Sequence, residues 1–160
     1  MSTKSDGSSW LLLLLGLLLL GGTGAAIYYA ARGLRNNNPG NIKYNAANNW
    51  QGQTGQDSDG FVIFDTMQDG VRALALLLIN YGAQGYDTVS SIISHFSATD
   101  QAAYISDVAS DLSVDPNATL DMTSADTISN LVNAITLQEN GFNPLTASTV
   151  SSGVSQAFNA

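Results

Sequence analysis

Glu139 is the residue whose type and position best suit chemistry in this sequence. It is the only glutamate among 13 acidic residues. It lies four residues after Ile135, so both residues fall on the apolar face of a predicted helix. Partial burial and the negative end of the helix dipole both disfavour an anion there and raise the pKa of the carboxyl. A raised pKa suits a general acid near neutral pH. The alternative is a helix-terminal glutamate that reaches water.

A group of asparagines could bind a ligand. The candidates are Asn36, Asn38 and Asn41, in a segment without regular apolar spacing. An amide side chain offers both a donor and an acceptor, which suits sugar hydroxyls and N-acetyl groups. Asparagine also favours turns, so a purely structural loop is the alternative.

Composition excludes several kinds of site. The net charge of −8 disfavours binding to nucleic acid, whose backbone is anionic. The sequence has no cysteine, which excludes disulfides and thiolate metal sites. His95 is the only histidine, so a histidine-based metal cluster cannot form. We therefore expect no metal and no cofactor.

An apolar segment precedes the polar part of the chain. Trp10 to Ala31 contains no charged residue. As a helix it would span roughly 33 Å, against about 30 Å of hydrocarbon in a bilayer. The sequence thus predicts a transmembrane helix over residues 10–31, in contact with lipid. A cleaved signal peptide is the alternative, although the apolar run continues past the loosely matching cleavage site.

The remainder predicts an α+β domain, mostly helical, with one small β-hairpin. The apolar run Phe61–Phe64 predicts a strand that pairs with the region around Trp50. The other expected elements are a short strand at Ile42–Tyr44, a turn over residues 51–60, helices over residues 66–81, 87–96, 100–112 and 124–140, and a loosely ordered tail after Pro144. Gly141 is a suitable residue to end the last helix.

Several ordered motifs resemble phage virion proteins that degrade peptidoglycan. They are Arg-Asn-Asn-Asn-Pro-Gly-Asn-Ile from Arg35, Trp-Gln-Gly-Gln-Thr-Gly from Trp50, Gly-Phe-Val-Ile-Phe from Gly60 and Gly-Val-Arg-Ala-Leu from Gly70. Glu-Asn-Gly-Phe-Asn-Pro, from Glu139, resembles a stretch of lysozyme-like lytic transglycosylases in which the catalytic glutamate ends a helix. The resemblance covers residues 34–144 and implies a lysozyme-like domain.

The resemblance implies roles for particular residues. Glu139 would be the catalytic acid and base. Further substrate-binding candidates, besides the three asparagines above, are Gln53, Thr54, Tyr104 and Asn140. Glycoside hydrolysis commonly uses two carboxylates, whereas a lytic transglycosylase needs only one. Asp57 and Asp59 are the candidates for a helper carboxylate, which would make the protein a muramidase instead.

The predicted organisation is a short polar N-terminus at residues 1–9, a transmembrane helix at 10–31, a lysozyme-like muralytic domain at 33–145 and a Ser/Thr/Ala-rich tail at 146–160. The predicted function is membrane-anchored, virion-associated cleavage of the MurNAc-GlcNAc bond during phage genome entry or lysis. The alternative is a non-catalytic structural membrane protein of a lipid-containing virion, which binds glycan or capsid. Expected partners are peptidoglycan strands and lipid, with capsid or other virion membrane proteins as further candidates, and no nucleic acid. The expected location is a virion internal membrane or the host cytoplasmic membrane.

Overall fold

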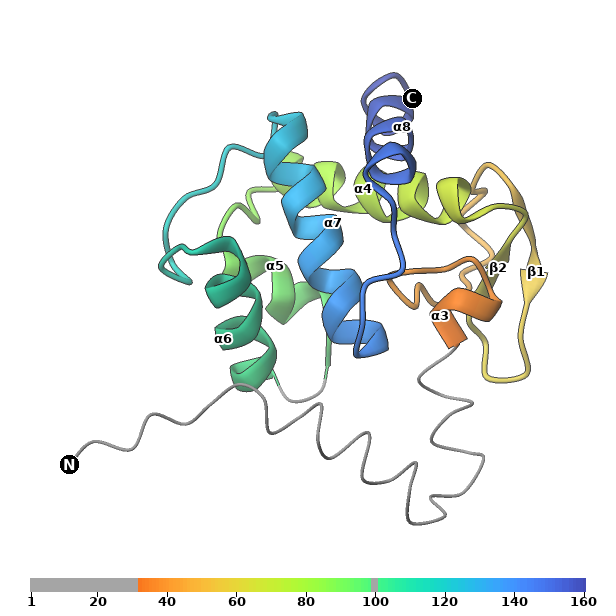
Figure 1. Ribbon diagram of the computed structural model, residues 1–160, viewed down its shortest axis with the longest axis horizontal. Helices are drawn as coiled ribbons and strands as arrows, with labels where there is room; N and C mark the ends of the chain where they lie inside the picture. Colours follow the sequence, from red (N-terminus) through yellow and green to blue (C-terminus); the bar gives the residue numbers. More distant parts are fainter. Residues whose placement is uncertain (1–31, 99–100) are drawn as a thin grey trace, which may run out of the picture.

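A computed structural model describes residues 32–98 and 101–160 of the chain (Figure 1). Within these ranges the elements are α3 (Arg32–Arg35), β1 (Gln53–Gln56), β2 (Val62–Phe64), α4 (Met67–Ala83), α5 (Val89–Phe96), α6 (Gln101–Leu112), α7 (Ala125–Asn140) and α8 (Ala147–Phe158). The predicted domain of helices with one hairpin is therefore present, with two additional helices at its ends.

The hairpin is formed by β1 and β2, which pair antiparallel with Gln53 opposite Phe64. The pairing is irregular between Gln53 and Gly55. The expected turn over residues 51–60 was wrong in its first half, because β1 falls there. Strand β1 consists of Gln, Thr and Gly, so it lacks the apolar alternation that identifies a strand in sequence. The strand expected at Ile42–Tyr44 is reduced to a single bridge between Lys43 and Phe61.

Side-chain caps fix where the helices begin and end. Thr66 caps α4 by accepting a hydrogen bond from the backbone N–H of Asp69, and Ser124 caps α7 in the same way. Gly141 ends α7 in the left-handed conformation with φ of 72°, as the sequence predicted. This end matters because it fixes the position of Glu139.

The core lies between α4 and the helices that cover it. In Figure 1 α4 runs across the back of the domain, α7 crosses in front of it, and α5 and α6 lie at the opposite side from the hairpin. The largest fully buried side chains come from β2, α4, α5, α6 and α7 and include Phe64, Leu74, Leu78, Ile92, Ile93, Val108, Ile128, Leu131 and Ile135. All of these except Phe64 lie within the four helices that the sequence predicted.

The C-terminal segment is helical and packed, so the expectation of a loosely ordered tail was wrong. Helix α8 buries Val150, Val154 and Ala157. A Cβ on Gly153 would come within 2.6 Å of a Val71 methyl carbon, so α8 lies very close to α4. The segment is rich in Ser and Thr on its exposed side, and that composition hid the short apolar stripe.

Removing part of this stripe tests whether α8 belongs to the folded core. Val154→Ala is expected to lower the free energy of unfolding by about 2 kcal/mol, because it leaves a cavity at a buried position. Ser155→Ala, on the exposed side of the same helix, should change it by less than about 0.5 kcal/mol. Chemical denaturation measures both values. Equal stability of the two variants would mean that α8 is not packed as described.

The predicted fold class needs one correction. In residues 32–98 and 101–160 no helix is long and apolar enough to cross a membrane. The transmembrane helix predicted over residues 10–31 lies outside the described residues. The fold that the structure supports is a mostly helical domain with a two-stranded antiparallel sheet.

Candidate functional site

Glu139 lies at the end of α7, where three separate segments of the chain meet. Its Oε1 accepts a hydrogen bond of 3.0 Å from the Tyr104 hydroxyl of α6. Its Oε2 accepts one of 3.0 Å from the Asn41 side-chain amide, which also donates to the Glu139 backbone oxygen at 3.1 Å. The structure therefore brings together three residues that the sequence singled out for one site.

The surroundings of Glu139 shift the pKa of its carboxyl in two opposite directions. Burial raises the pKa of the carboxyl, while the hydrogen bonds from Asn41 and Tyr104 and the charge of Arg32 partly oppose that rise. The net pKa lies above the usual value. Burial and the nearby carboxyl also raise the pKa of Tyr104, so its hydroxyl remains a neutral donor. Such a carboxyl can hold a proton and is still stabilised after losing it.

Asn41 has an uncommon backbone conformation, in a turn that Asn38 stabilises. Its φ of 46° is positive, which is uncommon outside glycine but tolerated by asparagine. The buried Asn38 side chain fixes the preceding turn: its amide donates to the carbonyls of Ile42 and Val62 at 2.9 Å each, and its oxygen accepts from the Ile42 N–H. The turn thus presents Asn41 to Glu139.

Three of the predicted substrate-binding residues are buried and form hydrogen bonds within the fold. Asn36, Asn38 and Asn140 are only 3%, 0% and 4% exposed. Asn36 donates to Asp57 at 2.7 Å, and Asn140 donates to the backbone oxygens of Pro39 and Thr136. We therefore reassign all three to holding the loop against α7 and the hairpin, because buried amides bonded within the chain cannot meet a ligand.

The two candidate helper carboxylates are engaged with Arg32. Its guanidinium lies 3.0 Å from Asp59 and 3.8 Å from Asp57. Burial alone would raise the pKa of Asp57, but hydrogen bonds from the Phe61 N–H, Asn36 and the Asp59 N–H, together with the Arg32 charge, lower it. Because the Arg32 charge acts on Glu139 as well, Arg32 links the helper candidates to the Glu139 site. The sequence did not single out Arg32, which directly follows the predicted transmembrane segment.

The remaining predicted residues lie on the hairpin. Thr54 donates to the Ile63 carbonyl at 3.2 Å, and the side-chain oxygen of Gln53 is buried without a hydrogen-bond partner. In Figure 1 strand β1 is at the outer edge of the domain, with α3 between the hairpin and the end of α7. The structure does not gather these two residues with Glu139. In the described part of the chain no three potential metal-ligating side chains cluster together.

The raised pKa of Glu139 predicts a pH dependence of stability. A carboxyl whose folded-state pKa is raised stabilises the folded state fully below its usual pKa of 4.5, and loses that contribution as the pH rises through the raised value. We expect the free energy of unfolding to fall with pH above 4.5, and Glu139→Gln to flatten this slope. Denaturant titrations from pH 4 to 8 measure it. The lowered pKa of Asp57 acts in the opposite direction and is confined to pH values below about 5, so the slope due to Glu139 is read from pH 5 upward.

The fold and the site define a small, mostly helical domain in which a partly buried carboxyl on α7 accepts hydrogen bonds from a loop and from α6. No family model matches the chain. Protein P5 of Pseudoalteromonas phage PM2 is 34% identical to it over 136 residues, which cover 81% of this chain and 83% of that protein. The chain belongs to the family of this bacteriophage protein.

Proposed function

We propose that the domain works as part of a bacteriophage particle and cleaves the glycan strands of peptidoglycan, with Glu139 as general acid and base. The relationship to a phage protein supports the first half of this proposal. The second half is supported mainly by one observation: a partly buried carboxyl with a raised pKa, held by two neutral donors.

The proposed reaction is a transglycosylation that needs one carboxyl. Protonated Glu139 gives its proton to the glycosidic oxygen, and the bond between that oxygen and the sugar C1 breaks. The carboxylate that forms is stabilised by the Tyr104 hydroxyl and the Asn41 amide. It then takes the proton of the sugar's own 6-hydroxyl, whose oxygen attacks C1. The product is an anhydro sugar, and Glu139 is protonated again.

A muramidase reaction would need a second carboxylate that activates water. Asp57 accepts hydrogen bonds from two backbone N–H groups and from Asn36, and Asp59 pairs with Arg32. Because these carboxylates already serve the turn of the hairpin, the one-carboxyl reaction is the better supported of the two.

A non-catalytic structural protein of the virion is the second candidate function. Both carboxylate oxygens of Glu139 accept hydrogen bonds from within the chain, across sequence separations of 98 and 35 residues. The same contacts could therefore serve only to lock the loop, α6 and α7 together. The relationship to a phage protein supports this candidate better than it supports the enzyme.

Incubating the full chain with purified peptidoglycan sacculi separates the two candidates. The proposed enzyme releases soluble muropeptides. A structural protein binds the sacculi or leaves them alone, and releases nothing. The Glu139→Gln protein, purified in the same way, controls for contaminating hydrolases.

A further inference from the structure

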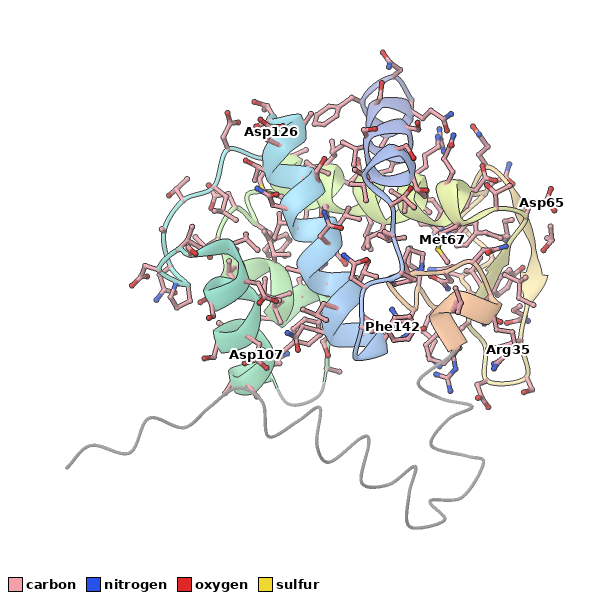
Figure 2. All side chains as sticks on the ribbon, in the orientation of Figure 1. Arg35, Asp65, Met67, Asp107, Asp126 and Phe142 are labelled. Carbon is pink, nitrogen blue, oxygen red and sulfur yellow. The ribbon has the colours of Figure 1, made fainter. Side chains whose placement is uncertain are left out.

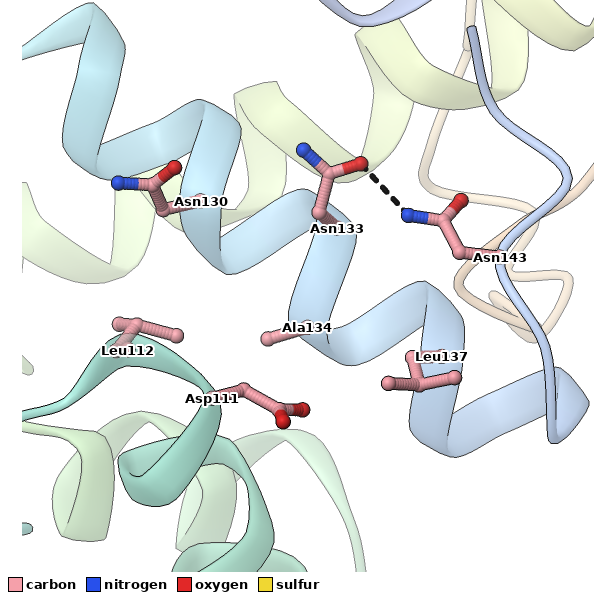
Figure 3. Close-up of a pocket in the computed structure, with 7 residues that line it drawn as sticks. All are labelled: Asp111, Leu112, Asn130, Asn133, Ala134, Leu137 and Asn143. Carbon is pink, nitrogen blue, oxygen red and sulfur yellow. Dashed lines mark hydrogen bonds between the residues drawn. The ribbon is translucent and has the colours of Figure 1, made fainter. Parts of the chain in front are cut away.

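A groove between α6 and α7 lies apart from the Glu139 site. It has a volume of about 270 Å³ and is lined by Asp111, Leu112, Asn130, Asn133, Ala134, Leu137 and Asn143 (Figure 3). Leu137 is only two residues before Glu139, but at 100° per residue the two side chains leave the helix about 200° apart. The groove is therefore on another side of α7.

One wall of this groove is preorganised. The Asn143 amide donates to the Asn133 side-chain oxygen at 2.8 Å (Figure 3). The Asn133 amide donates to the Ser129 carbonyl at 3.0 Å, and the Asn143 oxygen accepts from the Leu145 N–H at 2.9 Å. These bonds fix both amides, so a ligand would meet a rigid wall.

Two polar side chains of the groove, Asp111 on α6 and Asn130 on α7, are not used within the fold. Within the described part of the chain, the exposed side chains of Asp111 and Asn130 make no hydrogen bond. Leu112 and Leu137 add apolar surface, and Leu137 is 36% exposed although it is a large hydrophobic residue. Polar groups that converge on an apolar floor are typical of a small-molecule site.

The charges of the groove select the class of ligand. Asp111 repels anions, and none of the lining residues that the structure describes is basic. Asp107 and Asp126 lie on the same side of the domain, far from Arg35 (Figure 2). A carboxylate oxygen accepts from hydroxyls, and amides both donate and accept, so an uncharged sugar satisfies all of them. The volume of the groove is just below the roughly 300 Å³ at which pockets for drug-sized ligands begin. A groove of this size suits a single sugar ring.

We propose that this groove is a second glycan site, which binds an uncharged N-acetylated sugar unit and retains a glycan strand while the Glu139 site acts elsewhere. The proposal rests on the proposed glycan function, but binding in the groove does not need catalysis. Binding of a sugar in the groove and release of a cleavage product can therefore be measured separately.

The test is a titration of the full chain, ¹⁵N-labelled and carrying Glu139→Gln so that nothing is cleaved, with the uncharged trimer of N-acetylglucosamine. The side-chain amide signals of Asn130, Asn133 and Asn143 are expected to shift. Asn130→Ala should weaken this binding about fivefold, the loss of one hydrogen bond. Asn117→Ala removes another exposed amide, from the loop between α6 and α7, and should leave the affinity unchanged.

Three results would overturn the proposal: no shift of the groove amides, shifts confined to the loop around Asn41, or a response to a simple diamine but not to the trimer. Muropeptide release by the unmodified chain is read in a separate assay. If release is absent but the groove amides shift, the cleavage proposal fails and the groove site stands. If release is present but the groove amides are silent, the reverse holds.

Discussion

Glu139→Gln is expected to reduce muropeptide release from peptidoglycan by about a thousandfold, within the range that general acid–base groups contribute. Glutamine keeps the shape of the side chain but has no proton to give to the glycosidic oxygen. The Tyr104 hydroxyl can turn to accept a hydrogen bond from the new amide, so the contact between α6 and α7 survives. Release rates from purified sacculi, measured at equal protein concentration, give the ratio.

The matched control for this variant is Asp126→Asn. It also removes one carboxylate from α7, but from the exposed first turn at the other end of the helix. Its release rate should stay within about twofold of the parent, since surface substitutions away from a site have small effects. If Glu139→Gln retained the parent rate while folding normally, Glu139 would not be the acid.

Gly70→Ala is expected to lower the free energy of unfolding by about 3 kcal/mol, the upper end of the cost of overpacking. A Cβ at this position would collide with the backbone oxygen of Asn37 and come within 2.8 Å of the Pro39 ring. Both atoms belong to the loop that presents Asn41, so relief of the clash requires the loop to move away from α4. Alanine in an open helix position would otherwise stabilise the chain by up to about 1 kcal/mol.

Gly55→Ala is the control for this substitution. Gly55 lies in β1, and a Cβ there would meet no atom within 4 Å. The free energy of unfolding should change by less than about 0.5 kcal/mol. Chemical denaturation of both variants, with tyrosine and tryptophan fluorescence as the signal, tests the difference. A Gly70→Ala protein as stable as the Gly55→Ala protein would show that the loop does not pack on α4 as described.

The helices and the catalytic candidate Glu139 could be predicted from the sequence, because the patterns that indicate them lie within short segments of the chain. The buried residues of α7, Ile128, Leu131, Val132 and Ile135, have the spacing of an apolar helix face, and Gly141 predicted the end of the helix. The same spacing placed Glu139 on that face. Its contacts with Asn41 and Tyr104 span distant parts of the chain, and only the family resemblance suggested that these residues share a site.

Other features depend on tertiary packing and could not be predicted. Strand β1 has no apolar alternation, since its residues are Gln, Thr and Gly, and it exists because β2 supplies its partner. Helix α8 has only a short apolar stripe among Ser and Thr residues, and its packing on α4 is what makes the segment ordered. The asparagines of the loop have different roles, which depend on their burial in the folded protein. Asn38 is buried and stabilises the turn, while Asn41 donates a hydrogen bond to the Glu139 carboxylate.

Mass spectrometry of the material released from peptidoglycan tests the central claim most directly. A one-carboxyl mechanism with Glu139 predicts muropeptides with anhydro-muramic ends from the unmodified chain, and none from the Glu139→Gln chain under the same conditions. Reducing ends from the unmodified chain would contradict the one-carboxyl mechanism. Release of nothing at all would contradict catalysis and leave the structural role in the virion.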